Sequence, residues 1–225
     1  MALIVIEGVD GAGKSTQIRR LQHYLTDVLH RRHCHIHFPR PAESSVFSDL
    51  VARFLRGELG ALEEVNPYLV ALIYACDRAD CRTTLTQHLD QGEVVILDRY
   101  VYSNVAYQCA KVPPEEADRL KKWILDLEFG YFGLPKPDVN LFLDVPFQFT
   151  RERLTAARTG KERDYLHGKS DIHEADLLFQ QRVHDIYCTL SEEDRFVRID
   201  CSGPGRDMLP EETIFQQILN RLPVL

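Results

Sequence analysis

The first residues whose types and spacing indicate chemistry form a phosphate-binding loop near the start of the chain. The motif G-x-x-x-x-G-K-S/T directly follows the apolar residues 3–6. In such a loop the backbone N–H groups point at phosphate oxygens, Lys14 adds a positive charge, and the Ser15 hydroxyl can hold Mg²⁺. The helical spacing of Leu21 and Leu25 then predicts a helix whose N-terminal dipole favours anions. The loop and the threonine after it comprise Gly8, Val9, Asp10, Gly11, Ala12, Gly13, Lys14, Ser15 and Thr16.

Asp10 is an unusual residue for a loop that binds polyanions, because its carboxylate repels phosphate unless another group requires it. Two functional roles are available. It can order a substrate arginine or a metal-bound water, or it can accept a hydrogen bond from a substrate hydroxyl. The structural alternative is that Asp10 satisfies N–H groups of the loop, since aspartate often caps turns in this way.

A second acidic residue follows another apolar run. Residues 94–97 predict a buried strand, and Asp98 comes directly after it. Ligands in open α/β sheets bind outside the carboxyl ends of the strands, so Asp98 is expected near the phosphate loop, in the position of a Walker B acid. Arg99 comes next, and an arginine at this edge of a sheet has few structural reasons to be there.

The order of apolar segments predicts how these residues are positioned. Short apolar runs alternate with helical periodicity, which is typical of a parallel sheet covered by helices. We therefore expect a three-layer α/β/α fold of the P-loop NTPase type, with a five-stranded parallel sheet, as one domain over residues 1–225. The predicted strands are residues 3–6, 34–38, 94–97, 139–143 and 196–199.

The sequence also predicts where three helices begin. Asn66 followed by Pro67 predicts a long helix to about Leu89, closed by Gly92. Residues 171–174 resemble a capping box before another helix, with Leu178 and Phe179 among the residues of its apolar face. Pro210 is expected to start the final helix.

Composition limits the class of partner. The net charge of −7 argues against a general nucleic-acid or anionic-membrane surface, so phosphate recognition must come from local basic clusters. No apolar stretch approaches 18 residues and no signal-peptide pattern is present, so we expect a cytoplasmic protein. The six cysteines form no C-x-x-C pair and are expected as reduced thiols.

Residues 33–37 read His-Cys-His-Ile-His, which resembles a metal-binding tract. Alternation along a strand puts the three histidines on one face. With Phe38 adjoining, we interpret the tract as an exposed or half-buried edge strand in preference to a metal site.

Residues 151–170 form a basic segment with few large apolar residues. A solvated charged face is one explanation. Beside a phosphate loop, a lid that closes over the transferred phosphate and excludes water is favoured. Its basic residues are Arg151, Arg153, Arg158, Lys161, Arg163 and Lys169.

Four motifs together resemble the thymidylate kinase family along nearly the whole chain. They are residues 6–17, which read IEGVDGAGKSTQ, residues 72–78, the Asp98-Arg99-Tyr100 motif with the stretch from Ser103 to Tyr107, and residues 133–138. The resemblance implies that ATP phosphorylates dTMP to dTDP with Mg²⁺ and without a covalent intermediate, by positioning and charge neutralisation. It also implies a homodimer.

The resemblance implies roles on the donor side. Lys14 contacts the ATP phosphates, Ser15 holds the metal, and Asp98 orders metal-bound water. Asp10 orients the acceptor. Catalytic roles then fall to Asp10, Lys14, Arg99, Arg158 and Arg163.

Other implied roles concern the acceptor nucleotide, whose binding residues are Arg40, Tyr74, Arg78, Arg99, Ser103, Tyr107 and Tyr165. Arg40 and Arg99 bind its phosphate. Tyr74 stacks on thymine, Arg78 bonds a thymine carbonyl, and Tyr107 blocks a ribose 2′-hydroxyl. The structural alternatives are a core position for Tyr74, a surface pair with Asp77 or Asp80 for Arg78, and packing under the lid for Tyr107.

The chain departs from the family pattern in the phosphate loop. Some members carry an arginine where this chain has Gly11, so the catalytic arginine is expected from the lid. Arg158 or Arg163 is favoured over Arg151 and Arg153, which lie closer to the fourth strand.

Three rival functions fit the same loop. A deoxynucleoside kinase needs a carboxylate base for a neutral hydroxyl, whereas a monophosphate kinase needs extra arginines, and Arg40, Arg78 and Arg99 favour the latter. A monophosphate kinase for another base is the second rival. A GTP-binding switch usually carries an N-K-x-D segment, and none is present.

Overall fold

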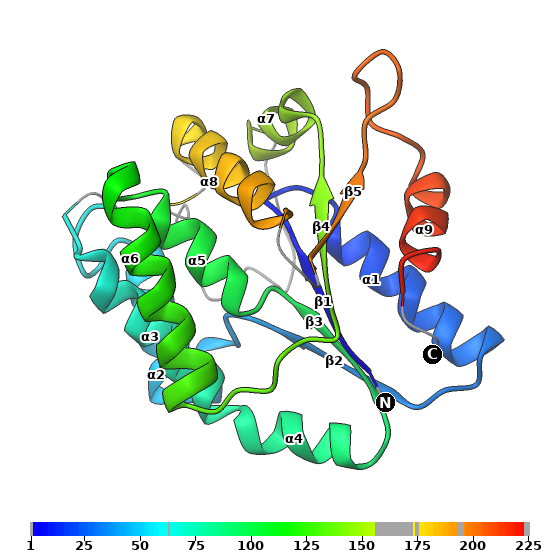
Figure 1. Ribbon diagram of the computed structural model, residues 1–225, viewed down its shortest axis with the longest axis horizontal. Helices are drawn as coiled ribbons and strands as arrows, with labels where there is room; N and C mark the ends of the chain where they lie inside the picture. The colour runs from blue at the N-terminus through cyan, green and yellow to red at the C-terminus, as the bar shows by residue number, and fades with distance from the viewer. Residues whose placement is uncertain (1, 63, 156–172, 174–175, 193–195, 223–225) are drawn as a thin grey trace.

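The computed structural model describes residues 2–62, 64–155, 173, 176–192 and 196–222, and a parallel sheet lies at its centre (Figure 1). The five strands have the order β2-β3-β1-β4-β5, which confirms the predicted sheet. They are β1 (Ala2–Glu7), β2 (His33–His37), β3 (Val94–Asp98), β4 (Val139–Asp144) and β5 (Phe196–Asp200).

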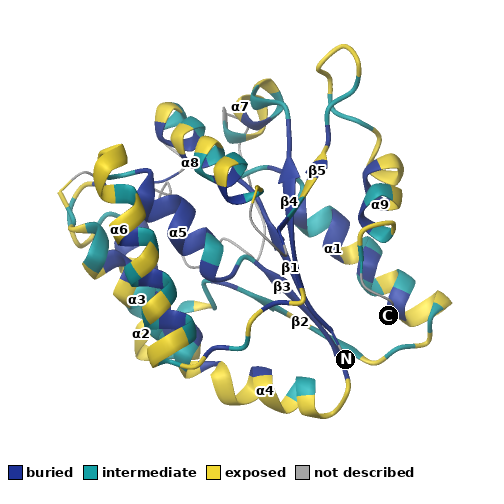
Figure 2. Ribbon diagram, viewed as in Figure 1, coloured by how far each residue is buried: buried dark blue, intermediate teal, exposed yellow. Residues whose placement is uncertain are grey.

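The three central strands are buried along their whole length, as Figure 2 shows in dark blue. Both faces of this sheet are covered by helices, so the strands are continuous apolar runs without alternation. In β1, Ile6 lies opposite Asp98 of β3, and Glu7 lies opposite Phe142 of β4. The carboxyl ends of these strands therefore meet at one edge of the sheet.

Helices cover the sheet in two outer layers (Figure 1). α1 (Lys14–His23) and α9 (Glu211–Leu219) pack together on one side. The opposite side carries α3 (Pro67–Asp80), α5 (Val101–Cys109), α6 (Pro114–Leu125) and α8 (Leu177–Leu190). The other helices are α2 (Val46–Leu55), α4 (Arg82–Asp90), α7 (Phe147–Thr155), the 3₁₀-helix η2 (Ala42–Ser44) and the π-helices η1 (Tyr24–Val28) and η3 (Asp126–Tyr131).

The helix predicted from Asn66 to Leu89 is two helices. Its start is as predicted, because the Asn66 side chain accepts a hydrogen bond from the Tyr68 N–H. The chain turns at Cys81, whose N–H bonds to the carbonyl of Arg78 at 3.1 Å. This turn lets α3 pack on α2 and α5 while α4 lies against β3. Apolar spacing alone does not reveal such a change of direction.

The capping box predicted at residues 171–174 does not start α8. The helix begins at Leu177, where the side chain of Asp176 accepts a hydrogen bond from the Phe179 N–H. Leu178, assigned to the apolar face, is 74% exposed. Of the four predicted cap residues only His173 lies within the described part of the chain, and it is in a turn.

The histidine tract is β2, an edge strand of the sheet, as predicted. His33 and His37 are half-buried and His35 is exposed. All six cysteines are free thiols. Within the described residues, no helix has the length and apolar character needed to cross a membrane.

Candidate active site

The phosphate loop joins β1 to α1 at the carboxyl edge of the sheet. Gly13 precedes α1 with a φ of +82°, a left-handed conformation that glycine adopts without steric cost. The N-terminal end of α1 therefore lies at the loop, where its dipole favours an anion. The Lys14 side chain folds back over the loop, and its Nζ donates to the carbonyls of Gly8 at 3.3 Å and Val9 at 3.2 Å.

Two buried cations face this loop. Lys14 is 8% exposed, and burial together with the nearby Arg99 lowers its pKa to about 8. The Arg99 guanidinium donates to the Gly8 carbonyl at 3.0 Å. Cations that repel each other in a buried loop are stabilised by an anion bound between them. The electrostatics of the loop therefore suit a polyphosphate.

Asp10 is held by three side chains from distant parts of the chain. Its Oδ1 accepts a hydrogen bond from Arg99 Nη2 at 2.7 Å, and its Oδ2 accepts from Tyr107 OH at 2.7 Å and Gln180 Nε2 at 2.9 Å. Burial opposes ionisation, but Arg99 and Lys14 hold the pKa of Asp10 well below its usual range. Asp10 is therefore a permanent carboxylate that orients donors, and the turn-capping alternative does not describe its contacts.

Arg99 has a strained backbone. Its φ is +66°, which is uncommon for a residue other than glycine and costs about 1 kcal/mol or more. The conformation is held on both sides, because the Arg99 N–H bonds to the Ile6 carbonyl at 3.0 Å and the Tyr100 N–H bonds to Glu7 Oε1 at 3.0 Å. It directs the guanidinium toward Asp10 and the loop.

Glu7 is a functional residue that the sequence reasoning missed. It is completely buried at the end of β1, and burial raises the pKa of its carboxyl group. Its Oε1 accepts from the N–H groups of Tyr100 and Ser103, and its Oε2 accepts from Ser103 Oγ at 2.5 Å and Tyr187 OH at 2.9 Å. One carboxylate thus caps the N-terminus of α5 and ties it to β1 and α8.

Asp98 lies at the end of β3 beside the loop, as predicted. Although Asp98 is buried, His37 on β2 holds its pKa well below the usual range, and the two side chains are 3.2 Å apart at Nδ1 and Oδ2. Asp98 Oδ1 is buried and has no hydrogen-bond partner in the described part of the chain. An ionised carboxylate with an unused buried oxygen fits a divalent cation or the water bound to one.

Arg40 lies in an acidic setting. Its Nε donates to Asp77 at 2.9 Å and its Nη2 donates to Asp80 at 2.7 Å, while Ser48 Oγ donates to the same Asp77 at 2.6 Å. Two carboxylates therefore fix the guanidinium beyond the end of β2. Its predicted role as a phosphate ligand stays a prediction.

Arg78 is buried, so the alternative of a surface residue is wrong. Its Nε and Nη2 donate to Glu128 at 2.5 and 2.7 Å, in a bidentate pair. Asn104, another residue that sequence reasoning missed, donates to the same Glu128 at 2.9 Å. Asn104 Oδ1 is buried and lacks a partner among the described residues. This acceptor beside a fixed arginine suits a ligand that carries an N–H group next to a carbonyl.

A cluster of aromatic rings includes Tyr107, whose hydroxyl donates to Asp10. Tyr74 is half-buried, and its ring meets that of Phe54 edge-on, with centroids 6.4 Å apart. The His173 ring lies 5.4 Å from the Phe54 ring and 5.0 Å from the Tyr107 ring. Burial keeps the pKa of His173 well below its usual value, so His173 is neutral. The sequence pattern did not distinguish His173 or Gln180 from other polar residues near a helix start.

The described part of the predicted lid is helical. Arg151 and Arg153 lie in α7, and a Cβ added to Gly11 would be 3.1 Å from the Arg153 Cβ. Arg153 also lines a pocket next to the loop, together with Ala12 and Gly13. The other named residues of the predicted lid lie outside the described residues, namely Arg158, Lys161, Arg163, Tyr165 and Lys169.

Comparison with known proteins identifies the family of the chain. The family model described as "Thymidylate kinase" matches residues 6–211. The thymidylate kinase of Mycobacterium tuberculosis strain H37Rv is 38% identical over 192 residues, covering 85% of this chain and 86% of that protein. The thymidylate kinase of Lacticaseibacillus casei strain BL23 is 30% identical over 227 residues, covering 99% and 97%.

A solved structure shows the same fold. The thymidylate kinase of Candida albicans superimposes with a TM-score of 0.73 and 23% sequence identity, covering 97% of this chain and 89% of that one. The five-stranded parallel sheet with helices on both sides is thus a P-loop NTPase fold.

We predict that Glu7→Gln lowers the free energy of unfolding by about 1–3 kcal/mol, because a neutral amide replaces a carboxylate that accepts four hydrogen bonds. Since Glu7 also holds the start of α5, the variant should weaken binding of dTMP, the acceptor that the sequence predicts. Urea unfolding and calorimetric titration measure the two effects.

Tyr187→Phe is the matched control, because it removes one hydrogen bond to Glu7 and leaves the α5 N–H groups paired. It should lower stability and leave the dTMP affinity within about threefold of the parent, an effect below 1 kcal/mol. Equal losses of affinity in both variants would mean that Glu7 acts only through global stability.

Proposed function

The chain belongs to the thymidylate kinase family and transfers a phosphoryl group from ATP to dTMP, and we propose that the Asp10–Arg99 pair aligns the two substrates. The observation that carries this proposal is a carboxylate inside a phosphate loop, bonded at 2.7 Å to an arginine that also reaches the loop carbonyl of Gly8. Arg99 also donates to Ser103 Oγ at 3.3 Å and to Tyr107 OH at 3.1 Å, so it links the phosphate loop to two predicted acceptor residues on α5.

Asp10 acts without exchanging a proton in this proposal. The acceptor oxygen belongs to a phosphate that is already ionised, so the reaction needs no general base. The depressed pKa of Asp10 agrees with this, because the carboxylate stays charged. Its contribution is to hold Arg99 and Tyr107 where the acceptor phosphate and sugar bind.

The donor site is the phosphate loop. Its backbone N–H groups and Lys14 bind the ATP phosphates, and Ser15 and Asp98 hold Mg²⁺. The unpartnered Asp98 Oδ1 supports this assignment. A bound Mg²⁺ neutralises charge on the phosphates, and no residue of the site forms a covalent intermediate.

The acceptor base binds next to the Arg78–Glu128 pair. Thymine presents carbonyls on either side of an N–H group. Arg78 donates to a carbonyl, and Asn104 Oδ1, buried without a partner in the described chain, accepts from the N–H. Tyr74 stacks on the ring, and the two acids beside Arg40 hold its guanidinium for the dTMP phosphate.

The arginines favour this reaction over that of a deoxynucleoside kinase. A neutral 5′-hydroxyl needs a base and carries no charge that acceptor-side arginines would bind, whereas the site presents Arg40 and Arg99 with side chains that are 14% and 11% exposed. Partly buried cations of this kind are stabilised by an anionic acceptor.

The chain also offers a surface for the homodimer that family membership suggests. Leu69 is 61% exposed and Leu72 is 37% exposed on α3. We propose that this face of α3 lies in the dimer interface, and a solution mass of one 26.0 kDa chain at assay concentrations would contradict it.

A coupled assay with ATP and Mg²⁺ tests the substrate. We expect the highest kcat/KM for dTMP, a lower value for dUMP, and near-background rates for dGMP and thymidine. Lys14→Ala should abolish nearly all turnover and keep the circular dichroism spectrum of the parent. A preference for dGMP or thymidine would contradict the proposed substrate.

Tyr107 is predicted to exclude a ribose 2′-hydroxyl and, by its own hydroxyl, to hold Asp10. Tyr107→Phe keeps the bulk and removes the 2.7 Å bond to Asp10, so kcat should fall about 5- to 10-fold with the deoxyribose preference intact. Tyr107→Ala should also raise activity on the ribonucleotide relative to dTMP. An unchanged ratio in Tyr107→Ala would assign Tyr107 to packing.

Among the two lid arginines in the described part of the chain, we propose Arg153 as a cation for the transferred phosphoryl group, because it lies next to Gly11 of the phosphate loop. Arg153→Ala should lower kcat roughly 100-fold or more and leave the Kd for dTMP nearly unchanged. Arg151→Ala is the matched control on the same helix and should keep near-parent turnover. If the two variants behave alike, Arg158 or Arg163 supplies the charge, as the sequence predicts.

A further inference from the structure

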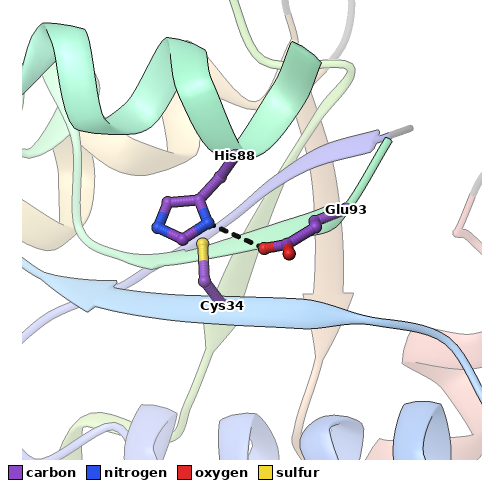
Figure 3. Close-up of side chains that lie close together, drawn as sticks. All are labelled: Cys34, His88 and Glu93. Carbon is purple, nitrogen blue, oxygen red and sulfur yellow. Dashed lines mark hydrogen bonds and ion pairs between the residues drawn. The ribbon is translucent and has the colours of Figure 1, made fainter. Parts of the chain in front are cut away.

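A second cluster of chemically reactive side chains lies far from the phosphate loop. Cys34 comes from β2, His88 from α4 and Glu93 from the residue before β3, and their side chains converge (Figure 3). Glu93 precedes β3 and Asp98 ends it, so the cluster is roughly 16 Å along the strand from the catalytic edge. No step of the phosphoryl transfer uses these residues.

The geometry brings three metal-ligand atoms together. His88 Nδ1 lies 2.7 Å from Glu93 Oε2, and the ligand atoms of all three residues are within 4.8 Å of one another. Ligand atoms around tetrahedral Zn²⁺ are about 3.4–3.6 Å apart, as follows from bond lengths of about 2.0–2.3 Å. Small side-chain rotations therefore bring these atoms to zinc spacing.

The chemistry of the donors selects the class of metal. One sulfur, one imidazole nitrogen and one carboxylate oxygen suit a borderline cation such as Zn²⁺, whereas Mg²⁺ and Ca²⁺ prefer oxygen alone. Cys34 is half-buried and the His88 side chain is 33% exposed, so an ion can enter from solvent and keep a water as its fourth ligand.

We propose that Cys34, His88 and Glu93 form a zinc-binding site that fastens the edge strand β2 to α4 and β3. In the histidine tract of residues 33–37 it is thus the cysteine that binds metal. β2 pairs with β3 on one side only, so a metal link adds a second attachment for an edge strand.

Groups around the cluster are compatible with this site. Arg32 pairs with Glu93 Oε1, so Oε2 is the oxygen that faces His88 and the metal. The Arg32 side chain is 72% exposed, so solvent screens its charge. Burial raises the pKa of the Cys34 thiol to about 11, so zinc binding releases the Cys34 proton to solvent as the Zn–S bond forms.

The chain contains a matched control cluster. Asp144, His184 and Cys188 also lie together, with His184 Nε2 2.6 Å from Asp144 Oδ1. The hydrogen bond to Asp144 raises the pKa of His184 to about 10, so zinc binding at this cluster would have to displace a proton from the imidazole as well as one from the Cys188 thiol. We expect this second cluster to bind zinc poorly.

The test uses the reduced full-length chain after removal of metals by a chelator. Titration with Zn²⁺ should show one site per chain, and Co²⁺ should give a thiolate-to-cobalt charge-transfer band. Cys34→Ser and His88→Gln should each weaken Zn²⁺ binding at least about 100-fold and remove the band. Cys188→Ser should change neither measurement, and dTMP phosphorylation should be unchanged in all three variants.

Thermal unfolding gives a second readout. At a free Zn²⁺ concentration about 100-fold above Kd the parent Tm should rise by roughly 5–10 °C, and Mg²⁺ should not reproduce the rise. His88→Gln keeps a polar side chain at position 88, and its metal-free Tm checks that the variant folds. Absence of a Zn²⁺ site, or a site that survives Cys34→Ser and His88→Gln, would overturn the proposal.

Discussion

The structure of the site depends on one buried carboxylate, that of Glu7. It lies where β1 ends, and it accepts hydrogen bonds from the first turn of α5 and from Tyr187 on α8. A buried charge costs several kcal/mol unless it is fully hydrogen-bonded. Separating β1, α5 and α8 would remove hydrogen bonds from this carboxylate, so its burial holds the three elements together. Arg99 lies between β3 and α5 and has a left-handed backbone conformation. Hydrogen bonds of the Arg99 N–H to the Ile6 carbonyl and of the Tyr100 N–H to Glu7 stabilise this conformation.

Asp10 is a carboxylate that lowers the repulsion between two neighbouring cations. Lys14 and Arg99 are two partly buried cations beside the phosphate loop, and they repel each other when no phosphate is bound. A carboxylate between them relieves that repulsion, and its bonds to Tyr107 and Gln180 keep it from approaching the phosphates freely.

Much of the fold was predictable because its signals are local. Apolar runs with no alternation predict the three buried central strands, and the Asn66-Pro67 pair predicts the start of α3. The turn at Cys81 was not predictable, because apolar spacing continues through it and only packing on β3 shows the change of direction. The start of α8 was misplaced because more than one acidic residue of this segment can cap a helix, and in the structure Asp176 accepts the hydrogen bond from the Phe179 N–H.

The sequence alone determined the phosphate loop, the acid at the end of β3 and the family, since each rests on residue types at fixed short spacings. Tertiary structure decided how the charges pair. Glu7, Glu128 and Gln180 have hydrogen-bond partners 24 to 180 residues away, and no local pattern reveals which residues those partners are. It also placed Arg153 against Gly11 and Cys34 beside His88. The physical reason is that burial and hydrogen-bond partners, which set the charge and position of each group, arise only when distant segments pack together.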